Sequence, residues 1–390
     1  RFATDADTTL RVDTLVSSPG SVLEVGTPDQ PVDAAVTATI EVADTGPIDV
    51  ARDPSQLGRG LVLHGTVRMH GADRTDWTAL AEAPRSGDDR LVLPDAPTGW
   101  QVGDRLVVAG VQPDGTGEEQ VSVAAVEGST AVLDGALSED HVPPRADLDV
   151  HVANLTRNVV VASASKELDR RGHVMFMHNR DVDVANAAFV DLGRTDKTVP
   201  LADVVADAAT GAICGVDGPV TNPRARYSVH FHRNGVVDDG DRSTVTGSVV
   251  EGNPGWGYVN HSSSVDFVDN VAFDVAGAAY NTEAGDETGS FVRNLSVRTH
   301  GPGSIPARAE QPTERRETQD FGFAGHGFWL QGPAVDLEGN VAAGATGAGI
   351  MVYSEGLIES GVGRAAFGDE AGGEPFPVVQ QPLARFTDNS

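Results

Sequence analysis

The chain has 390 residues, of which 39% are apolar and 22% charged, and its formal net charge is −29. This length can bury a long core, as one large domain or two, while so acidic a chain excludes nucleic acid and anionic membrane surfaces as partners. No apolar run approaches the roughly 18 residues of a membrane span, and Arg1 begins in sequence typical of a folded domain rather than of a signal peptide. The single cysteine, Cys214, excludes an intramolecular disulfide and a cysteine-based zinc cluster.

Residues 1–149 alternate short apolar segments with turns and are predicted to form one β region. The 45 glycines and 22 prolines lack collagen spacing and favour a turn-dense, all-β protein. Residues 8–26, 37–42 and 60–71 fit strands of a first coil. Over residues 86–140 the pattern changes to strand pairs with tight turns, which predicts a small antiparallel β-barrel inserted in the coil.

A repeat of about 22 to 24 residues runs from Gly172 to Tyr353. Its clearest copies are 22, 48 and 22 residues apart and begin at Gly255, Gly277, Gly325 and Gly347. Four copies or their relatives carry an asparagine seven residues before the glycine, namely Asn186, Asn270, Asn294 and Asn340. Such a period indicates a solenoid. We predict a right-handed, pectate-lyase-like parallel β-helix over residues 150–365, and a turn-rich tail with a last strand over residues 366–390.

The repeat also predicts columns of side chains, because equivalent positions of successive rungs lie about 4.8 Å apart. Side chains alternate across a strand, so the apolar third positions face the core: Met175, Val229, Tyr258, Tyr280, Phe328 and Ile350. The outward sixth positions are His178, His232, His261 and Glu283. The outward fourth positions are Phe176, His230, Val259 and Asn281. This strip is either a functional site or a solvated ladder of histidines.

Several motifs resemble a known family. Similarity to the glycine-rich G8 domain rests on Pro19-Gly-Ser-Val-Leu-Glu-Val-Gly, Leu63-His-Gly-Thr-Val-Arg-Met-His-Gly, Trp77-Thr, Trp100-Gln-Val-Gly-Asp and Leu155-Thr-Arg-Asn. A second resemblance is to the β-helix that follows G8 in the family of the cell-migration-inducing hyaluronan-binding protein and its transmembrane relative. It rests on Arg171-Gly-His, Arg226-Tyr-Ser-Val-His-Phe-His and Ala278-Ala-Tyr-Asn-Thr-Glu. The resemblance spans roughly residues 8–300. It implies an extracellular or cell-surface protein with hyaluronan-related polysaccharide activity.

The histidines of the strip fit a metal site. His230 and His232, two residues apart on one strand, face the same way about 6.5 to 7 Å apart, and neighbouring rungs add His178 and His261. Neutral imidazole is a common ligand of zinc and copper, so these four histidines are candidate metal ligands. The alternative is metal-free acid–base catalysis by the same histidines with Glu283, without a cofactor.

Two kinds of polysaccharide cleavage fit the residues. A glycoside hydrolase needs a carboxyl pair, which Glu283 with Asp286 or Glu287 would provide. A lyase needs a base for the C5 proton of a uronate and a cation or metal for its carboxylate. The predicted catalytic residues are therefore His230, His232, Glu283, Asp286 and Glu287.

Basic side chains cluster in sequence around the strip and could guide an anionic glycan in an otherwise acidic chain. The predicted substrate-binding residues are Arg171, Arg180, Arg194, Arg226, Arg233, Asn281 and Trp329. The sequence thus predicts an enzyme that degrades an acidic polysaccharide, hyaluronan-like by resemblance. The alternatives are a non-catalytic glycan-binding or adhesion module, and a metal-dependent β-helix enzyme with another substrate.

Overall fold

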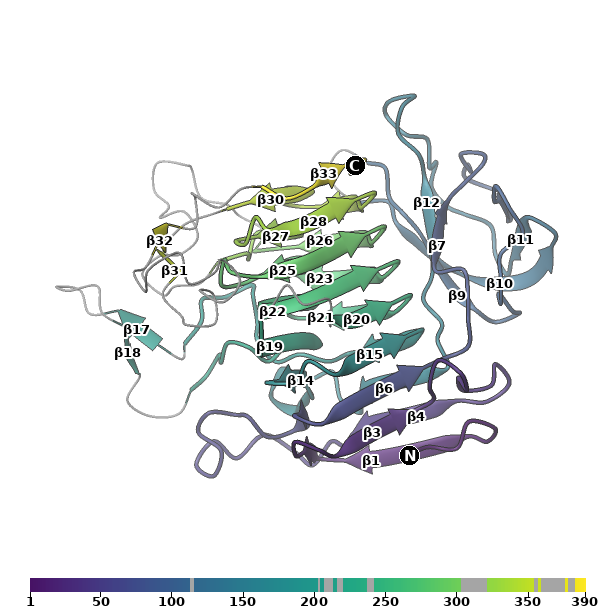
Figure 1. Ribbon diagram of the computed structural model, residues 1–390. Coiled ribbons are helices and arrows are strands. Elements are labelled where there is room, and N and C mark those ends of the chain that lie inside the picture. Colours follow the sequence, from purple (N-terminus) through teal and green to yellow (C-terminus); the bar gives the residue numbers. More distant parts are fainter. Residues whose placement is uncertain are drawn as a thin grey trace.

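The computed structural model describes residues 1–112, 116–202, 204–206, 213–215, 220–236, 242–302, 321–353, 357–358, 376–377 and 383–390. Strands stack into a column of rungs, with the N-terminus at one end and the C-terminus near the other (Figure 1). The described part is all-β apart from one 3-10 turn, Leu168–Arg170, and none of its helices is long and apolar enough to cross a membrane. The prediction of an all-β parallel β-helix is confirmed. Most of the tail predicted over residues 366–390 lies outside the described residues.

Three parallel ladders form the faces of the column. The first contains β1 (Thr8–Val12), β4 (Ala38–Val42), β13 (Val159–Ser163), β16 (Ala187–Val190), β21 (Val249–Asn253), β23 (Val271–Ala276), β26 (Leu295–His300) and β29 (Val341–Ala345). The second contains β2 (Thr14–Ser17), β5 (Gly60–Leu63), β14 (Val174–Met177), β19 (Val229–Gly235), β22 (Tyr258–Val268), β24 (Ala278–Thr282), β27 (His326–Leu330) and β30 (Ile350–Val352).

The third ladder contains β3 (Val22–Val25), β6 (Thr66–His70), β15 (Val182–Ala185), β20 (Ser243–Thr246), the second half of β22, β25 (Thr288–Val292), β28 (Val335–Glu338) and β33 (Phe386–Thr387). Two short antiparallel pairs lie outside the ladders: β17 (Val204–Ala206) with β18 (Ile213–Gly215), and β31 (Leu357–Ile358) with β32 (Phe376–Pro377). The first rungs, which begin at residue 8, thus belong to the same coil as the later ones.

Aromatic rings form a column in the core of the second ladder. Tyr258 pairs in register with Val229 on one side and Tyr280 on the other, and Tyr280 pairs with Phe328. The ring centroids of Tyr258 and Tyr280 lie 4.9 Å apart, and those of Tyr280 and Phe328 lie 4.7 Å apart. All three rings are fully buried. The spacing follows from the parallel register, which places like positions of successive rungs one strand separation apart.

The prediction that Met175 is the first inward-facing residue of this column is wrong, because the strand is shifted by one residue. Met175 pairs with His230 and therefore lies on the outer side of β14, whereas Val174 and Phe176 contribute to the core. The predicted repeat alignment starts this strand from Gly172. A Cβ at that position would lie 2.7 Å from the side chain of Val42, so packing against Val42 requires a glycine there. Apolar residues on both faces of β14 hide the alternation that would have revealed the shift.

An antiparallel sheet of six strands interrupts the coil. Its order is β7 (Trp77–Ala79), β12 (His151–Asn154), β9 (Arg105–Val108), β10 (Glu119–Glu127), β11 (Thr130–Leu133) and β8 (Arg90–Val92). A hydrogen bond from the N–H of Ala81 to the carbonyl of Val92 (2.8 Å) links its two ends. The sheet has its own apolar core and extends beyond the predicted residues 86–140, because β7 and β12 pair with it and not with the coil.

Buried asparagines form a ladder at the start of the first-ladder strands. The side-chain oxygen of Asn294 accepts the backbone N–H of Asn270 (3.0 Å), and that of Asn340 accepts the backbone N–H of Asn294 (3.0 Å). Each amide nitrogen also donates to a carbonyl within the coil, as Asn294 does to Phe267 (2.8 Å). The asparagines that recur at fixed spacing in the sequence thus satisfy backbone groups at the rung corners, where no strand partner is present.

Replacing Asn294 with alanine is expected to lower the free energy of unfolding by about 2–4 kcal/mol, because it leaves several buried polar groups without partners. Urea denaturation monitored by circular dichroism measures the loss. Gln120→Ala, which removes an exposed amide from β10, is the matched control and should change the stability by less than about 0.5 kcal/mol. Equal stability of the two variants would contradict the role given to the ladder.

Candidate functional site

The candidate site lies on the outer side of the second ladder, over β19, β22, β24 and β27. The register aligns four residues in one column, His230, Val259, Asn281 and Trp329. The neighbouring column begins with the pair His232 and His261 and continues with Glu283 and Gln331, which directly follow β24 and β27. We call His230, His232, His261 and Glu283 the histidine array.

Turns fix where these side chains stand. Arg233 and Ser262, which directly follow His232 and His261, have left-handed φ values of 54° and 47°. Such values are uncommon for residues other than glycine, asparagine and aspartate. Ala225 also has a positive φ, 69°, and its carbonyl oxygen lies 3.1 Å from Nδ1 of His230. The carbonyl of a strained turn residue therefore fixes the orientation of the His230 ring.

Three imidazoles and one carboxylate of the array meet at short range. One ring nitrogen from each of His230, His232 and His261 lies within 4.8 Å of the others. The rings of His232 and His261 are perpendicular at 4.7 Å, and those of His230 and His261 are stacked at 5.8 Å. Oε2 of Glu283 lies 3.2 Å from Nδ1 of His261 and 3.7 Å from Nε2 of His230. His230 is fully buried, and the other three are half-buried.

Burial and mutual charges set the protonation of the array. Burial lowers the pKa of His230 to about 4 and the pKa of His232 to about 2, so both rings are neutral at pH 7. Burial also acts to lower the pKa of His261, but the carboxylate of Glu283 outweighs it and raises that pKa. Burial acts to raise the pKa of Glu283, but the charge of His261, the largest opposing cause, holds it far below its usual range. Glu283 is therefore ionised.

Several polar atoms of the site are buried without a hydrogen-bond partner among the described residues. They are Nε2 of His230, Nδ1 of His232, Nδ1 of His261, Oε2 of Glu283 and both side-chain polar atoms of Asn281. Nearly all buried polar atoms of folded proteins have a partner, and each exception costs about 1–3 kcal/mol. So many exceptions in one place indicate that the site is arranged to hold something other than its own side chains.

His178 does not belong to the array. The one-residue shift of β14 places Met177 opposite His232, and the exposed His178 then occupies the left-handed turn position, with φ 51°, that Arg233 occupies in the next rung. Its ring lies 6.4 Å from that of His232 and 6.1 Å from that of His64. Of the four predicted metal ligands, three therefore converge, namely His230, His232 and His261.

The two further predicted carboxyl groups stand beside the array in the loop after β24. Glu287 is fully buried, and its oxygens accept the backbone N–H groups of Ser262 (3.0 Å), Ala284 (2.6 Å) and Gly285 (2.8 Å). Burial, followed by the charge of Asp286, raises the pKa of Glu287 to about 7. Asp286 is itself 1% exposed. The bonds of Glu287 give it a role in shaping this loop and the turn after His261.

Three of the predicted substrate-binding arginines have structural partners. The guanidinium of Arg194 donates to four backbone carbonyls, including those of Gln56 (2.7 Å) and Arg171 (2.6 Å), and Arg226 donates to the same loop. Both are buried. Arg171 pairs with Asp191 at 3.2 Å. Repeat spacing could not reveal this, because the carbonyls that bind Arg194 and Arg226 come mainly from an earlier rung, more than 130 residues away.

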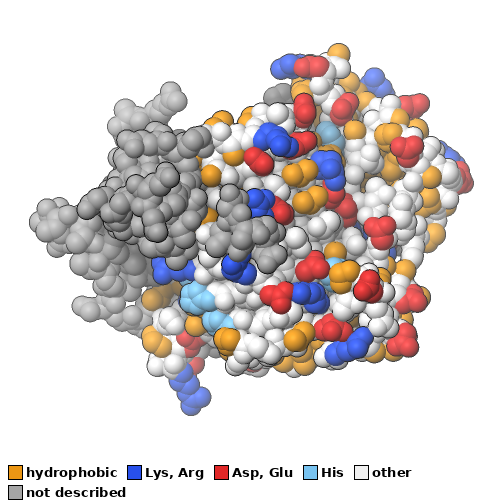
Figure 2. Space-filling view, viewed as in Figure 1, with side chains coloured by type: hydrophobic (Ala, Val, Ile, Leu, Met, Phe, Trp, Pro, Cys, Tyr) orange, Lys and Arg blue, Asp and Glu red, His pale blue; other side chains and the backbone are white. Residues whose placement is uncertain are grey.

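Arg233 is the predicted arginine that remains exposed next to the array. Its charge lies close enough to act on the pKa of both His232 and His261. Arg180 lines a separate hollow with Arg68 and Arg242. Figure 2 shows pale blue histidine side chains reaching the surface close to blue basic ones on the left of that view. A local positive group thus stands beside the array in an acidic protein.

Replacing Arg233 with alanine is expected to raise the KM for an anionic glycan by roughly 10- to 100-fold, because hydrogen bonds to charged groups contribute about 1.5–3 kcal/mol. Steady-state kinetics at two salt concentrations would measure it, since the charge is exposed and screened by salt. Arg11→Ala, which removes an exposed arginine from β1, is the control and should leave KM unchanged. An equal KM in both variants would contradict a substrate contact at Arg233.

Trp329 and a lysine that the sequence did not single out border the site. Trp329 is fully buried and stacks on Phe321 (4.7 Å), which stacks on Trp256 (5.5 Å). Lys197 places its ammonium 3.9 Å from the centroid of Trp256 and donates to the carbonyl of Phe321 (2.8 Å). Lys197 lies between rungs, so no repeat spacing points to it. Asn281 and Trp329 are thus wall residues beside the array rather than exposed contacts.

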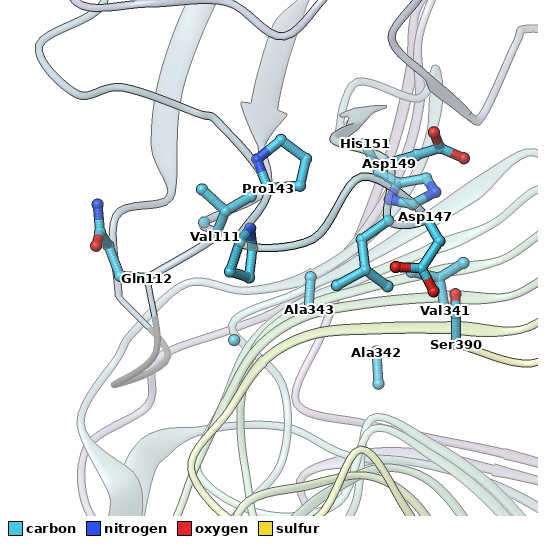
Figure 3. A pocket seen from close by; sticks show the side chains of 14 residues that line it. Val111, Gln112, Pro143, Asp147, Asp149, His151, Val341, Ala342, Ala343 and Ser390 are labelled. Atoms are coloured by element: carbon cyan, nitrogen blue, oxygen red, sulfur yellow. The ribbon is translucent and has the colours of Figure 1, made fainter.

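A second hollow lies between the antiparallel sheet and the first ladder (Figure 3). Its volume is about 250 Å³, and Pro143, His151, Val341, Ala343 and Ser390 are among its lining residues. Its polar side chains do not converge on one point in Figure 3, and Asp147 and Asp149 are among them. The hollow does not adjoin the histidine array.

Two family models match the chain: the G8 domain over residues 1–81 and the CEMIP β-helix over residues 220–390. The chain belongs to the G8-domain and CEMIP β-helix family. A G8 domain-containing protein of Dictyostelium discoideum is 27% identical over 335 residues, which cover 84% of this chain and 25% of that protein. Fibrocystin-L of Homo sapiens is 23% identical over 88% of this chain and 8% of its own length. This G8 protein therefore spans a quarter or less of these relatives.

Solved structures similar to this G8 protein include two phage tailspikes. The tailspike of Pseudomonas phage phi297 aligns with 87% of the chain and 66% of its own, at 14% identity and a TM-score of 0.22. The tailspike of Acinetobacter baumannii bacteriophage AP22, in complex with a capsular saccharide, aligns with 90% of the chain and 63% of its own, at 11% identity and a TM-score of 0.20.

Proposed function

We propose that this G8 protein is an extracellular or cell-surface enzyme that cleaves an acidic, hyaluronan-like polysaccharide at the histidine array. The observation that carries the proposal is the ionised, half-buried Glu283 among three imidazoles, each of which has one buried nitrogen without a hydrogen-bond partner among the described residues. A structural ladder of histidines would be expected to satisfy its own polar atoms. The polysaccharide class rests on the resemblance to the family of the cell-migration-inducing hyaluronan-binding protein and on the CEMIP β-helix match.

Within this proposal Glu283 is the proton acceptor. Its pKa lies far below its usual range, so it is ionised at any physiological pH. In a β-elimination it would take the C5 proton of a uronate, the C4–O bond would break as the C4–C5 double bond forms, and that proton or one from water would pass to the leaving oxygen; in a hydrolysis it would take a proton from the attacking water. Arg233 would bind the sugar carboxylate, which limits the substrates to acidic glycans.

The carboxyl groups favour elimination over hydrolysis by a carboxyl pair. Hydrolysis of that kind needs a second carboxyl group that can protonate the leaving oxygen. Glu287 has the raised pKa that such an acid needs, but both its oxygens are held by backbone N–H groups. Elimination needs a base, a positive group for the sugar carboxylate and a proton for the leaving oxygen. Glu283 and Arg233 meet the first two needs, and the proton taken from C5, or one from water, meets the third.

Incubation with hyaluronan, chondroitin and other uronic-acid glycans, with neutral dextran as control, tests the proposal. Absorbance at about 232 nm reports the unsaturated product of elimination, and a reducing-end assay reports every chain cleavage. We expect both signals with an acidic glycan and neither with dextran. Reducing ends without absorbance would assign hydrolysis instead. Binding without either signal would make the protein a glycan-binding module and overturn the enzymatic proposal.

A further inference from the structure

We propose that His230, His232 and His261 form a binding site for a single late first-row divalent metal ion, with zinc as the reference ion and Glu283 beside its open coordination position. The inference deepens the proposed function, because it concerns the same site. The geometry of the three imidazoles supports it, and binding of the ion does not require that a glycan be cleaved.

The hydrogen bond made by His230 leaves one of its ring nitrogens with a free lone pair. Nδ1 of His230 lies 3.1 Å from the carbonyl oxygen of Ala225, which can only accept, so Nδ1 carries the proton. Nε2 is then left with its lone pair, buried and without a partner among the described residues. Metal-binding histidines commonly donate their other N–H to a backbone carbonyl in this way, which fixes the tautomer.

His261 and Glu283 are in contact within the array. Nδ1 of His261 and Oε2 of Glu283 form an ion pair at 3.2 Å whose geometry is outside that of a well-aligned hydrogen bond. Nδ1 of His232 is likewise buried without a hydrogen bond in the described part of the chain. A cation at the centre would satisfy one nitrogen of each of the three rings, and its charge would attract the neighbouring carboxylate of Glu283.

The size of the cluster fits one ion. The three ligand nitrogens lie within 4.8 Å of one another. Metal–nitrogen bonds of about 2.1 Å in a tetrahedral site separate the ligand atoms by roughly 3.4 Å, so the rings would close on the ion by about 1 Å or less. Three protein ligands leave one position for water or substrate, which is the pattern of catalytic zinc sites rather than of structural ones.

The donor atoms select the class of metal. Calcium and magnesium take oxygen ligands, whereas imidazole suits zinc, cobalt, nickel and copper. The apolar side chains of Met175 and Val259, both buried, pack in the same cluster of residues that surrounds the site. An apolar wall of this kind restricts water at a metal. The carboxylate of Glu283 supplies a negative charge next to the ion.

Metal titration of the untagged protein tests the inference without any glycan. After dialysis against a chelator, isothermal titration with zinc chloride should give one equivalent, and cobalt chloride should give the visible absorption bands of a four- or five-coordinate ion. His232→Ala and His261→Ala should each weaken zinc binding at least 100-fold. His178→Ala, which removes the exposed histidine next to the site, is the matched control and should bind zinc like the unmodified protein.

Thermal unfolding provides the second readout and guards against misfolded variants. Saturating zinc should raise the Tm of the unmodified protein and of His178→Ala but not of the other two variants, because only a bound ligand stabilises the folded state. Absence of zinc binding, or equal affinity in all four proteins, would overturn the metal site. Glycan cleavage by a protein that binds no zinc would leave the proposed function standing, and zinc binding without cleavage would overturn only that function.

Discussion

Replacing Glu283 with glutamine is expected to lower the kcat/KM for cleavage of the acidic glycan by about 10²- to 10⁴-fold, the contribution typical of a positioned proton acceptor. Glutamine has the same shape but cannot accept a proton from carbon or water at neutral pH. Glu283 lies 3.2 Å from Nδ1 of His261 and 3.7 Å from Nε2 of His230. The substitution therefore also removes the negative charge beside these two rings. Reducing-end kinetics measure the effect, with circular dichroism to verify folding.

The control for this substitution is Glu338→Gln. Glu338 ends β28 on another ladder, is 43% exposed in its side chain and pairs with Arg385 at the surface. Its replacement should leave kcat/KM unchanged within about twofold, because exposed ion pairs contribute little. If Glu283→Gln kept cleavage within about threefold of the unmodified protein, Glu283 would not be the proton acceptor.

Replacing Tyr280 with alanine is expected to lower the free energy of unfolding by about 3–5 kcal/mol, as is usual when a buried aromatic ring is removed from a core. Tyr280 is fully buried and lies in the middle of the aromatic column, between Tyr258 and Phe328. The rungs on either side cannot close the resulting cavity without breaking their parallel register. Urea denaturation measures the loss.

Val352→Ala is the matched control for the core prediction. Val352 lies on β30 of the same ladder, but 41% of it is exposed. Its truncation should change the stability by less than about 0.5 kcal/mol. A loss at Tyr280 no larger than the loss at Val352 would contradict the account of the core.

The repeat made the fold and part of the site predictable. Gly255 and Gly277 set a common frame, so that the register of Tyr258 with Tyr280 follows from counting residues. The same frame, applied to Arg226, brings His232 beside His261. These positions could be aligned because each rung repeats both the turn glycine, or its substitute, and the apolar residues that face the core.

Other features depended on contacts that no spacing reveals. The shift of β14 arises because Gly172 is needed for packing against Val42, so a glycine that looks like part of the frame is not. Arg194 looks like a substrate ligand in the sequence, but the carbonyls that hold it come mainly from residues 56–59 of an earlier rung. The alternation of side chains along the strand predicts that His230 faces outward. It does not predict that neighbouring residues bury His230 completely.

A crystal structure of the Glu283→Gln protein with a bound uronic-acid tetrasaccharide tests the central claim most directly, because this variant should bind the glycan without cleaving it. The account predicts that the glycan lies across the histidine array, with a sugar carboxylate within hydrogen-bond distance of Arg233 and a sugar ring in contact with the side chain at position 283. A tetrasaccharide bound elsewhere, for example at the hollow lined by Arg68, Arg180 and Arg242, with no contact to the array, would contradict it.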